Sequence, residues 1–210
     1  NVLTNRNLAL ACQRFDAVLL SISSDYVFDG ENAPAGGYRE WDEPHPLSRY
    51  GETKRWGEQV VESLLNKFFI VRTSWLFGPG RPTWVDLVLS AGRDDRPIAA
   101  ARDMVSSPTF TADLAPALLE LVESRCYGIY HLSNSGSCSR EELAREVLGI
   151  HRLQRYTGLR ALTLAELRLP APRPRYSVLD NAAWRAEGRK PLRDWKSALA
   201  EYFVSRPAAI

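Results

Sequence analysis

The 210-residue chain is 45% apolar, 10% aromatic and 25% charged, with a formal net charge of +2. These values predict a soluble globular protein of one or two domains and exclude a disordered chain, a collagen-like repeat and a disulfide-stapled miniprotein. The basic residues are 23 arginines and only 4 lysines, yet no run of like charges forms a basic arm. A nucleic-acid partner is therefore not expected.

The three cysteines, Cys12, Cys126 and Cys138, are far apart and form no CxxC or Cys/His cluster. This spacing predicts neither a metal site nor a disulfide framework, and buried thiols of this kind suit a reducing cytoplasm. No apolar run approaches the roughly 18 residues needed to span a bilayer. The first 15 residues also lack the basic and apolar regions of a signal peptide. We therefore expect a cytoplasmic protein without a membrane partner.

Short apolar runs alternate with amphipathic helical patterns along the first half of the chain. They predict a helix ending near Arg14, a buried strand over residues 17–23, a long loop over 29–46, a helix capped by Ser48, and a strand over 68–71. The sequence GPGRP, which begins at Gly78, ends this part of the pattern.

Further helices are predicted over residues 84–91, 113–123, 140–148 and 192–203, with strands around 98–100 and 128–132. Strands that alternate with helices of this length favour right-handed crossovers and a mostly parallel sheet. Beyond Gly149 the pattern weakens into Pro- and Arg-rich sequence. The expected fold class is α/β, with a boundary near Gly78 between residues 1–77, which hold the sheet, and a smaller, loop-rich region, 78–210.

The segment Tyr50-Gly-Glu-Thr-Lys54 places a phenol and an ammonium group on one face of the second helix. This pair suits proton transfer to a carbonyl oxygen as hydride reaches its carbon. A free tyrosine has a pKa of about 10, and a neighbouring cation favours the phenolate and brings that pKa toward neutrality. Lys54 could also hold a ribose hydroxyl. Tyr-x3-Lys pairs are common by chance, so the surrounding sequence decides their significance.

The sequence Ser23-Ser24-Asp25-Tyr26 follows the strand over residues 17–23, at the end where open parallel sheets bind ligands. A hydroxyl group there can hydrogen-bond a substrate carbonyl and share its developing negative charge with Tyr50. The alternative role for two serines after a strand is a turn or a helix cap. The strand-end serine, the long loop and the Tyr-x3-Lys helix together favour a catalytic site.

Three segments, SSDYVFDG, PLSRYGETK and VRTSWLFGPG, resemble the extended short-chain dehydrogenase/reductases. The segments VSSPTFTADLA, GIYHLSNSGSCSREELA and RPRYSVLDN narrow the resemblance to the dTDP-4-dehydrorhamnose reductase family. The likeness extends over nearly the whole chain, and the motifs occur in the family's order. It implies a Rossmann-type parallel sheet with a small C-terminal α+β region that binds substrate.

The resemblance also implies residue roles. Tyr50 would be the acid, Lys54 its partner, and Ser24 would stand where the family more often has threonine. The cofactor, NADPH or NADH, would contact Ser23, Tyr50, Lys54 and Thr73. The substrate, a dTDP-sugar, would contact Ser24, Asp25, Tyr26, Val27, Trp75 and Arg173.

Several other positions have competing interpretations. Trp75 would lie against the sugar or the base, unless it is an ordinary core residue beside a strand. Arg173 and Arg175 could pair with a diphosphate, because guanidinium groups bind phosphate bidentately, or they could be solvated surface residues. Residues 81–84 read Arg-Pro-Thr-Trp where the family usually has Asn-Phe, so an amide contact from this place is lost or replaced. His131 is expected in the core.

The Gly-rich turn that approaches the cofactor pyrophosphate in this fold is not found in the sequence. In the resembled family it lies upstream of the SSDY strand. We therefore expect this chain to be the C-terminal two thirds of a reductase, to bind NADPH weakly or not at all by itself, and to be inactive as a fragment. Hydride transfer to the C4 keto group of dTDP-4-dehydro-L-rhamnose is the expected reaction. A reductase or epimerase of another nucleotide sugar, and a non-catalytic regulatory relative, are alternatives, and a homodimer is one option for assembly.

Overall fold

The computed structural model describes residues 1–31 and 33–205 and places a three-stranded parallel sheet at one end of the molecule. Its strands are β1 (Leu19–Ser24), β2 (Phe68–Thr73) and β7 (Gly128–His131), in the order β1-β2-β7. The register aligns Ser24 at the end of β1 with Thr73 at the end of β2. The predicted α/β class with a mostly parallel sheet is confirmed.

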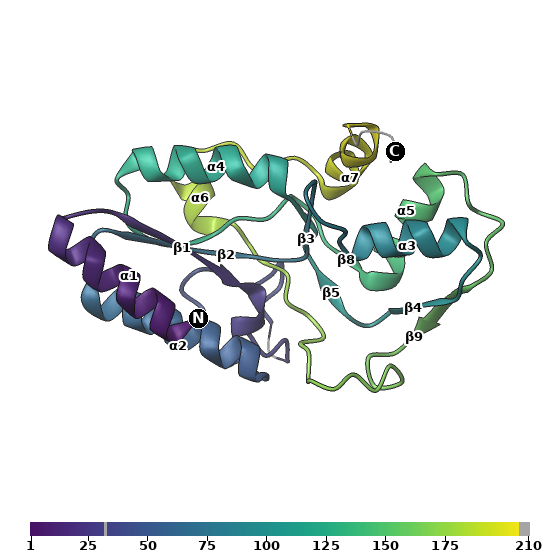
Figure 1. Cartoon of the computed structure of the whole chain (residues 1–210), viewed down its shortest axis with the longest axis horizontal. Helices are drawn as coiled ribbons and strands as arrows, with labels where there is room; N and C mark the ends of the chain where they lie inside the picture. The colour runs from purple at the N-terminus through teal and green to yellow at the C-terminus, as the bar shows by residue number, and fades with distance from the viewer. Residues whose placement is uncertain (32, 206–210) are drawn as a thin grey trace.

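Helices cover both faces of this sheet (Figure 1). Helices α1 (Val2–Phe15) and α2 (Arg49–Leu64) lie on one face, and α4 (Thr111–Ser124) and α6 (Ala182–Ala186) lie on the other. The alternation of side chains along β2 explains both layers, because Ile70 packs with α1 and α2 while Phe69 and Val71 pack with α4 and α6.

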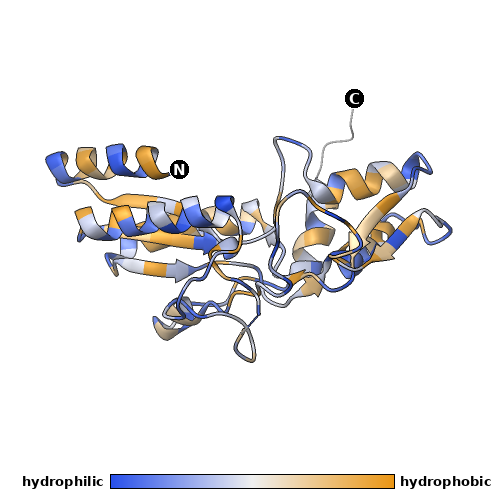
Figure 2. Ribbon diagram, turned by 90° about the horizontal axis from the view of Figure 1, so that it is seen from below, coloured by the Kyte–Doolittle hydropathy of each residue, from blue (hydrophilic) through white to orange (hydrophobic). Residues whose placement is uncertain are grey.

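A second group of elements lies at the other end of the long axis (Figure 2). It contains α3 (Trp84–Arg93), α5 (Arg140–Ile150), α7 (Trp195–Ser205), and the parallel pair β4 (Ile98–Ala101) and β9 (Leu159–Leu162). Two further pairs connect the groups, β3 (Leu76–Phe77) with β6 (Thr109–Phe110) and β5 (Val105–Ser106) with β8 (Cys138–Ser139). These elements enclose their own apolar core.

Local sequence accounts for the start of two helices that reach the site described below. Ser48 caps α2 by accepting a hydrogen bond from the backbone N–H of Gly51 at 3.2 Å, as predicted. Ser139 and Glu142 form a reciprocal capping box at the start of α5, with bonds of 3.1 and 2.7 Å. Both helix starts are therefore held by side chains already present in the local sequence.

The sequence predicted the long elements better than the short ones. The strand expected over residues 68–71 continues to Thr73, and the last helix begins at Trp195 rather than at residue 192. The two-residue strands, β9 and α6 were not predicted, although the four-residue strands β4 and β7 were. So few positions show a periodicity only poorly, and some short elements therefore escape recognition. Segments of α4, β7 and α6 return to the large sheet, and the domain boundary near Gly78 stays a prediction.

Within residues 1–31 and 33–205, no helix combines the length and the apolar character needed to cross a membrane.

Candidate active site

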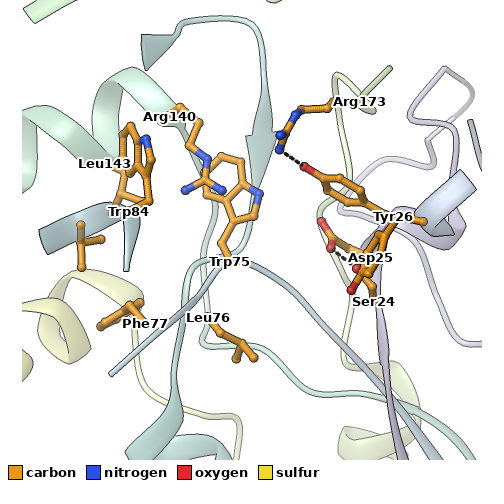
Figure 3. A pocket seen from close by; sticks show the side chains of 12 residues that line it. Ser24, Asp25, Tyr26, Trp75, Leu76, Phe77, Trp84, Arg140, Leu143 and Arg173 are labelled. Carbon is orange, nitrogen blue, oxygen red and sulfur yellow. Dashed lines mark hydrogen bonds between the residues drawn. The ribbon is translucent and has the colours of Figure 1, made fainter. Parts of the chain in front are cut away.

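The carboxyl ends of β1 and β2 and the first turn of α2 meet at one cavity of about 310 Å³. Ser24 ends β1, the short 3-10 helix η1 (Asp25–Val27) follows it, and Tyr50 lies in the first turn of α2. The lining residues come from both ends of the molecule: Ser24, Asp25, Tyr26, Tyr50, Trp75, Leu76, Phe77, Trp84, Val85, Arg140, Leu143 and Arg173 (Figure 3). A ligand here would contact both groups of elements.

Tyr50 and Lys54 lie one turn apart on α2, and Tyr50 is 48% exposed. The Lys54 Nζ atom is 5.9 Å from the centre of the Tyr50 ring and donates a hydrogen bond to the Ile22 carbonyl oxygen at 3.1 Å. Partial burial lowers the pKa of Lys54, and the carboxylate of Glu58 acts in the opposite direction. The ammonium group therefore lies beside the phenol, although Lys54 does not line the cavity itself.

Ser24 takes part in a polar cluster at the cavity wall. Its hydroxyl donates to Asp25 Oδ1 at 3.0 Å and accepts from the Tyr26 N–H at 3.2 Å, so Ser24 also caps η1. Asp25 accepts further bonds from Ser106 at 3.1 Å and Ser177 at 2.6 Å. Burial raises the pKa of Asp25 to about 6 in spite of these bonds. Ser24 lines the cavity, and a hydrogen bond from its hydroxyl to a ligand would replace the bond to Asp25.

Arg140, Trp75 and Trp84 lie across the cavity from Ser24 and Asp25, whereas Arg173 lies beside Tyr26 on the side of Ser24 and Asp25 (Figure 3). The Arg140 guanidinium carbon lies 3.7 Å from the centre of the Trp75 indole and 4.8 Å from that of Trp84. Arg173 Nη1 donates to the Tyr26 hydroxyl at 3.0 Å. Trp75 has a φ of +41°, a left-handed conformation that is rare for a bulky residue and that often marks a functional site.

Behind the cavity, α2 is attached to the sheet by a buried ion pair. Arg72 Nε and Nη2 bind Glu58 Oε1 and Oε2 at 3.0 and 2.8 Å, and both residues are at most 2% exposed. Ser23 donates to Glu58 at 2.5 Å, which turns its hydroxyl away from the cavity. His131 is fully buried, as expected, and its Nδ1 lies 2.9 Å from the Tyr38 carbonyl oxygen. Burial beside the Arg72 charge lowers the pKa of His131 well below its usual range.

Three other predicted contacts lie outside this cavity. Val27 is fully buried in a separate apolar cluster and presents no surface to a ligand. Arg175 is directed toward Asp103, with its Nε 4.0 Å from the carboxylate. Thr73 is buried at the end of β2, and its Oγ1 has no hydrogen-bond partner among the described residues. Val27, Thr73 and Arg175 thus lie elsewhere, whereas the structure brings six of the predicted residues to the lining of one cavity: Ser24, Asp25, Tyr26, Tyr50, Trp75 and Arg173.

Sequence reasoning did not identify Arg140, Trp84 or Glu58 as site residues. Arg140 and Trp84 are each the first residue of a helix, and the local sequence does not reveal which cavity either side chain faces. Glu58 did carry a signal, because it falls on the buried face of α2 between Gly51 and Val61. A carboxylate on an apolar face indicates a buried partner, which the structure shows to be Arg72.

Comparison with known proteins supports the resemblance drawn from the motifs. The model of the RmlD substrate binding domain matches residues 1–206. The chain belongs to this family. It is 42% identical over 209 residues to the dTDP-4-dehydrorhamnose reductase of Streptomyces griseus, covering 94% of this chain and 66% of that protein. It is 33% identical to a dTDP-4-keto-6-deoxy-D-glucose reductase of Streptomyces niveus, covering 94% and 68%.

A solved structure shares the fold of this RmlD-type chain. The crystal structure of dTDP-4-dehydrorhamnose reductase from Bacillus anthracis in complex with NADP has a TM-score of 0.92 and 35% identity, covering 98% of this chain and 72% of that one. The chain spans about two thirds of the length of the curated relatives that it matches.

Proposed function

We propose that the protein containing this chain is a reductase that uses NADPH, or NADH, to reduce the C4 keto group of dTDP-4-dehydro-L-rhamnose. The observation that supports this most strongly is the convergence of Ser24 and Tyr50 on one cavity, with the Lys54 ammonium beside the phenol. Two relatives named as reductases of dTDP-keto sugars, and a related structure that contains NADP, point to the same chemistry.

The residues at the carboxyl edge of the sheet fit the reactive end of a nicotinamide cofactor. Lys54, Tyr50 and the unpartnered hydroxyl of Thr73 offer hydrogen-bonding groups along this edge. The Ser23 hydroxyl is engaged by Glu58, so a contact from Ser23 would use its backbone. NADPH would supply the hydride. The sequence holds no Gly-rich turn, and we assign no residue to the pyrophosphate of the cofactor.

The side chains of this chain would provide the proton and orient the keto group. Tyr50 donates its phenolic proton to the C4 oxygen as negative charge develops there. Ser24 donates a second hydrogen bond to the same oxygen and fixes its direction. Lys54 places a positive charge 5.9 Å from the centre of the Tyr50 ring, opposite in sign to the phenolate that the proton transfer leaves.

The cavity also supports the predicted substrate contacts. Tyr26 and Trp75 supply aromatic surface beside Ser24, and Arg173 lies at the rim with a guanidinium group suited to a phosphate. The relative from Streptomyces niveus is named for a different dTDP-keto sugar, so a second sugar of that class is an alternative substrate.

The test is turnover by the complete gene product with a panel of dTDP-4-keto sugars and either NADPH or NADH. We expect the fastest NADPH consumption with dTDP-4-dehydro-L-rhamnose. Tyr50→Phe should lower kcat about 100-fold or more, because a positioned general acid contributes about 10²–10⁴-fold. An unchanged rate in Tyr50→Phe would refute the assignment of the acid. No turnover of any sugar by a correctly folded protein would favour a non-catalytic relative.

A further inference from the structure

The cavity contains more positive charge than its own residues neutralise. Arg140 and Arg173 both line it, and the side chain of Arg140 has no hydrogen-bond acceptor within residues 1–31 and 33–205. Asp25 is the acidic residue of the lining, and its carboxylate accepts bonds from three serine hydroxyls. Arg140 is partly buried, and a guanidinium whose N–H donors are unused in such a place favours a negatively charged ligand.

Arg140 is held in place before any ligand arrives. Its guanidinium lies against the Trp75 indole and near that of Trp84, and cation–π contacts of this kind fix a guanidinium without using its N–H donors. Burial lowers the pKa of Arg140 to about 10, so the group stays charged at neutral pH. The five N–H donors of an arginine therefore remain available to acceptors in the cavity.

Trp75 supplies a third, independent donor. Trp75 is only 9% exposed, and its indole Nε1 is buried without a hydrogen-bond partner among the described residues. In Figure 3 this edge of the ring faces the space between Arg140 and Arg173. Because Arg140 covers one face of the indole, that face is closed to stacking by a sugar or a base. Trp75 is thus better placed to donate a hydrogen bond than to stack through that face.

We propose that Arg140 and Arg173 together bind the diphosphate of the nucleotide sugar, and that the Trp75 indole N–H donates to an oxygen of the same ligand. This inference rests on the proposed function for the identity of the nucleotide. Two guanidinium groups on one cavity match the two charged phosphoryl groups of a nucleoside diphosphate. Ser24 and Tyr50 line the same cavity, which leaves the sugar ring next to the diphosphate within reach of the proton donor.

The direct test measures binding of dTDP by titration calorimetry, without turnover. Arg140→Met keeps the length and apolar stem of the side chain and removes the charge. We expect it to weaken dTDP binding about 10- to 100-fold, the range for a lost hydrogen bond to a charged group. The matched control is Arg145→Met on the same helix, whose guanidinium pairs with Glu141 and is largely exposed. The control should bind dTDP as the wild type does.

Further ligands separate phosphate binding from a structural role. Thymidine has no phosphate, so its affinity should be the same in the wild type and in Arg140→Met. Equal losses for dTDP and thymidine would overturn the proposal, because they would mean that Arg140 only supports the aromatic wall. NADP affinity should not change either, and a selective loss of NADP would reassign the site to the cofactor.

A second variant tests the indole donor. Trp75→Phe keeps an aromatic face for Arg140 but removes the N–H group, and should weaken dTDP binding several-fold. Binding of dTDP within twofold of wild type in both Arg140→Met and Trp75→Phe would refute the anion site.

Loss of dTDP binding in Arg140→Met together with no sugar turnover by the wild type would leave the anion site standing and refute the reductase. Normal turnover with an unchanged KM in Arg140→Met would refute the anion site and leave the reductase assignment standing.

Discussion

The buried pair Glu58–Arg72 attaches the helix that carries Tyr50 to the parallel sheet, and breaking it should be severe. Glu58→Gln keeps the size of the side chain and removes its charge, which leaves the Arg72 guanidinium buried at 1% exposure without a counter-charge. Removing one member of a buried pair costs about 3–5 kcal/mol. Since domains are typically stable by only about 5–15 kcal/mol, this is a large fraction of the total.

The assay is urea unfolding at neutral pH, followed by circular dichroism. The matched control is Glu62→Gln, on the same helix one turn further along, where the side chain is 30% exposed and pairs with Arg55 at 3.4 Å. The control should lose less than about 1 kcal/mol, as partly exposed pairs do. If Glu58→Gln were also within about 1 kcal/mol of wild type, the pair would not anchor α2 and the reasoning would be refuted.

A double variant separates the cost of an orphaned charge from the value of the pair. Replacing Glu58 and Arg72 together by methionine removes both charges and keeps an apolar volume between α2 and β2. We expect the double variant to recover a large part of the stability lost in Glu58→Gln, because apolar substitutes for a buried pair are often close to neutral. The unsatisfied Ser23 hydroxyl, which now donates to Glu58, should prevent full recovery.

The remaining predictions concern the site and its support. Ser24→Ala in the complete gene product should lower kcat about 100-fold, as loss of an oxyanion donor does, and Ser24→Thr should retain most of the rate. The pKa of Asp25 rises from 3.8 to about 6 on folding, so the folded state binds the Asp25 proton more tightly than the unfolded state does. The resulting contribution to the free energy of unfolding is full below pH 3.8 and is lost as the pH rises through 6. Urea unfolding should show that loss, about 3 kcal/mol, in wild type and not in Asp25→Asn. A Cβ on Gly51 would lie 2.2 Å from the Tyr26 carbonyl oxygen, so Gly51→Ala should destabilise the fold by about 1–3 kcal/mol. Gly149 has open space around it, so Gly149→Ala should stabilise α5 by up to about 1 kcal/mol in the same urea assay.

Much of the Ser24 and Tyr50 side of the candidate site could be predicted, because its residues lie in or next to elements with clear sequence patterns. Tyr50 and Lys54 share one helix, and helical spacing alone places them on one face. Ser24 ends an apolar strand, and the carboxyl ends of parallel strands bind ligands in this class of fold. Both facts depend only on local periodicity and on the general geometry of parallel sheets.

The wall of the cavity that carries Arg140 and Trp75 could not be predicted in this way. Arg140 is more than 60 residues from Trp75 in sequence, and their contact depends on how α5 packs against the loop after β2. Nothing in the neighbourhood of Arg140 distinguishes it from the other arginines of the chain. Val27 shows the converse, because it lies beside Tyr26 in sequence and yet points into a separate apolar cluster.

The amino-acid sequence alone determined the α/β class, the long helices and strands, and the pairing of a phenol with an ammonium group on α2. These follow from interactions between residues a few positions apart, whose geometry is set by the helix or strand that contains them. Tertiary structure decided which arginines line the cavity, which hydroxyl is turned away from it, and which carboxylate holds α2 to the sheet. Those outcomes depend on burial and on contacts between distant segments, and burial is what makes a charge without a partner costly.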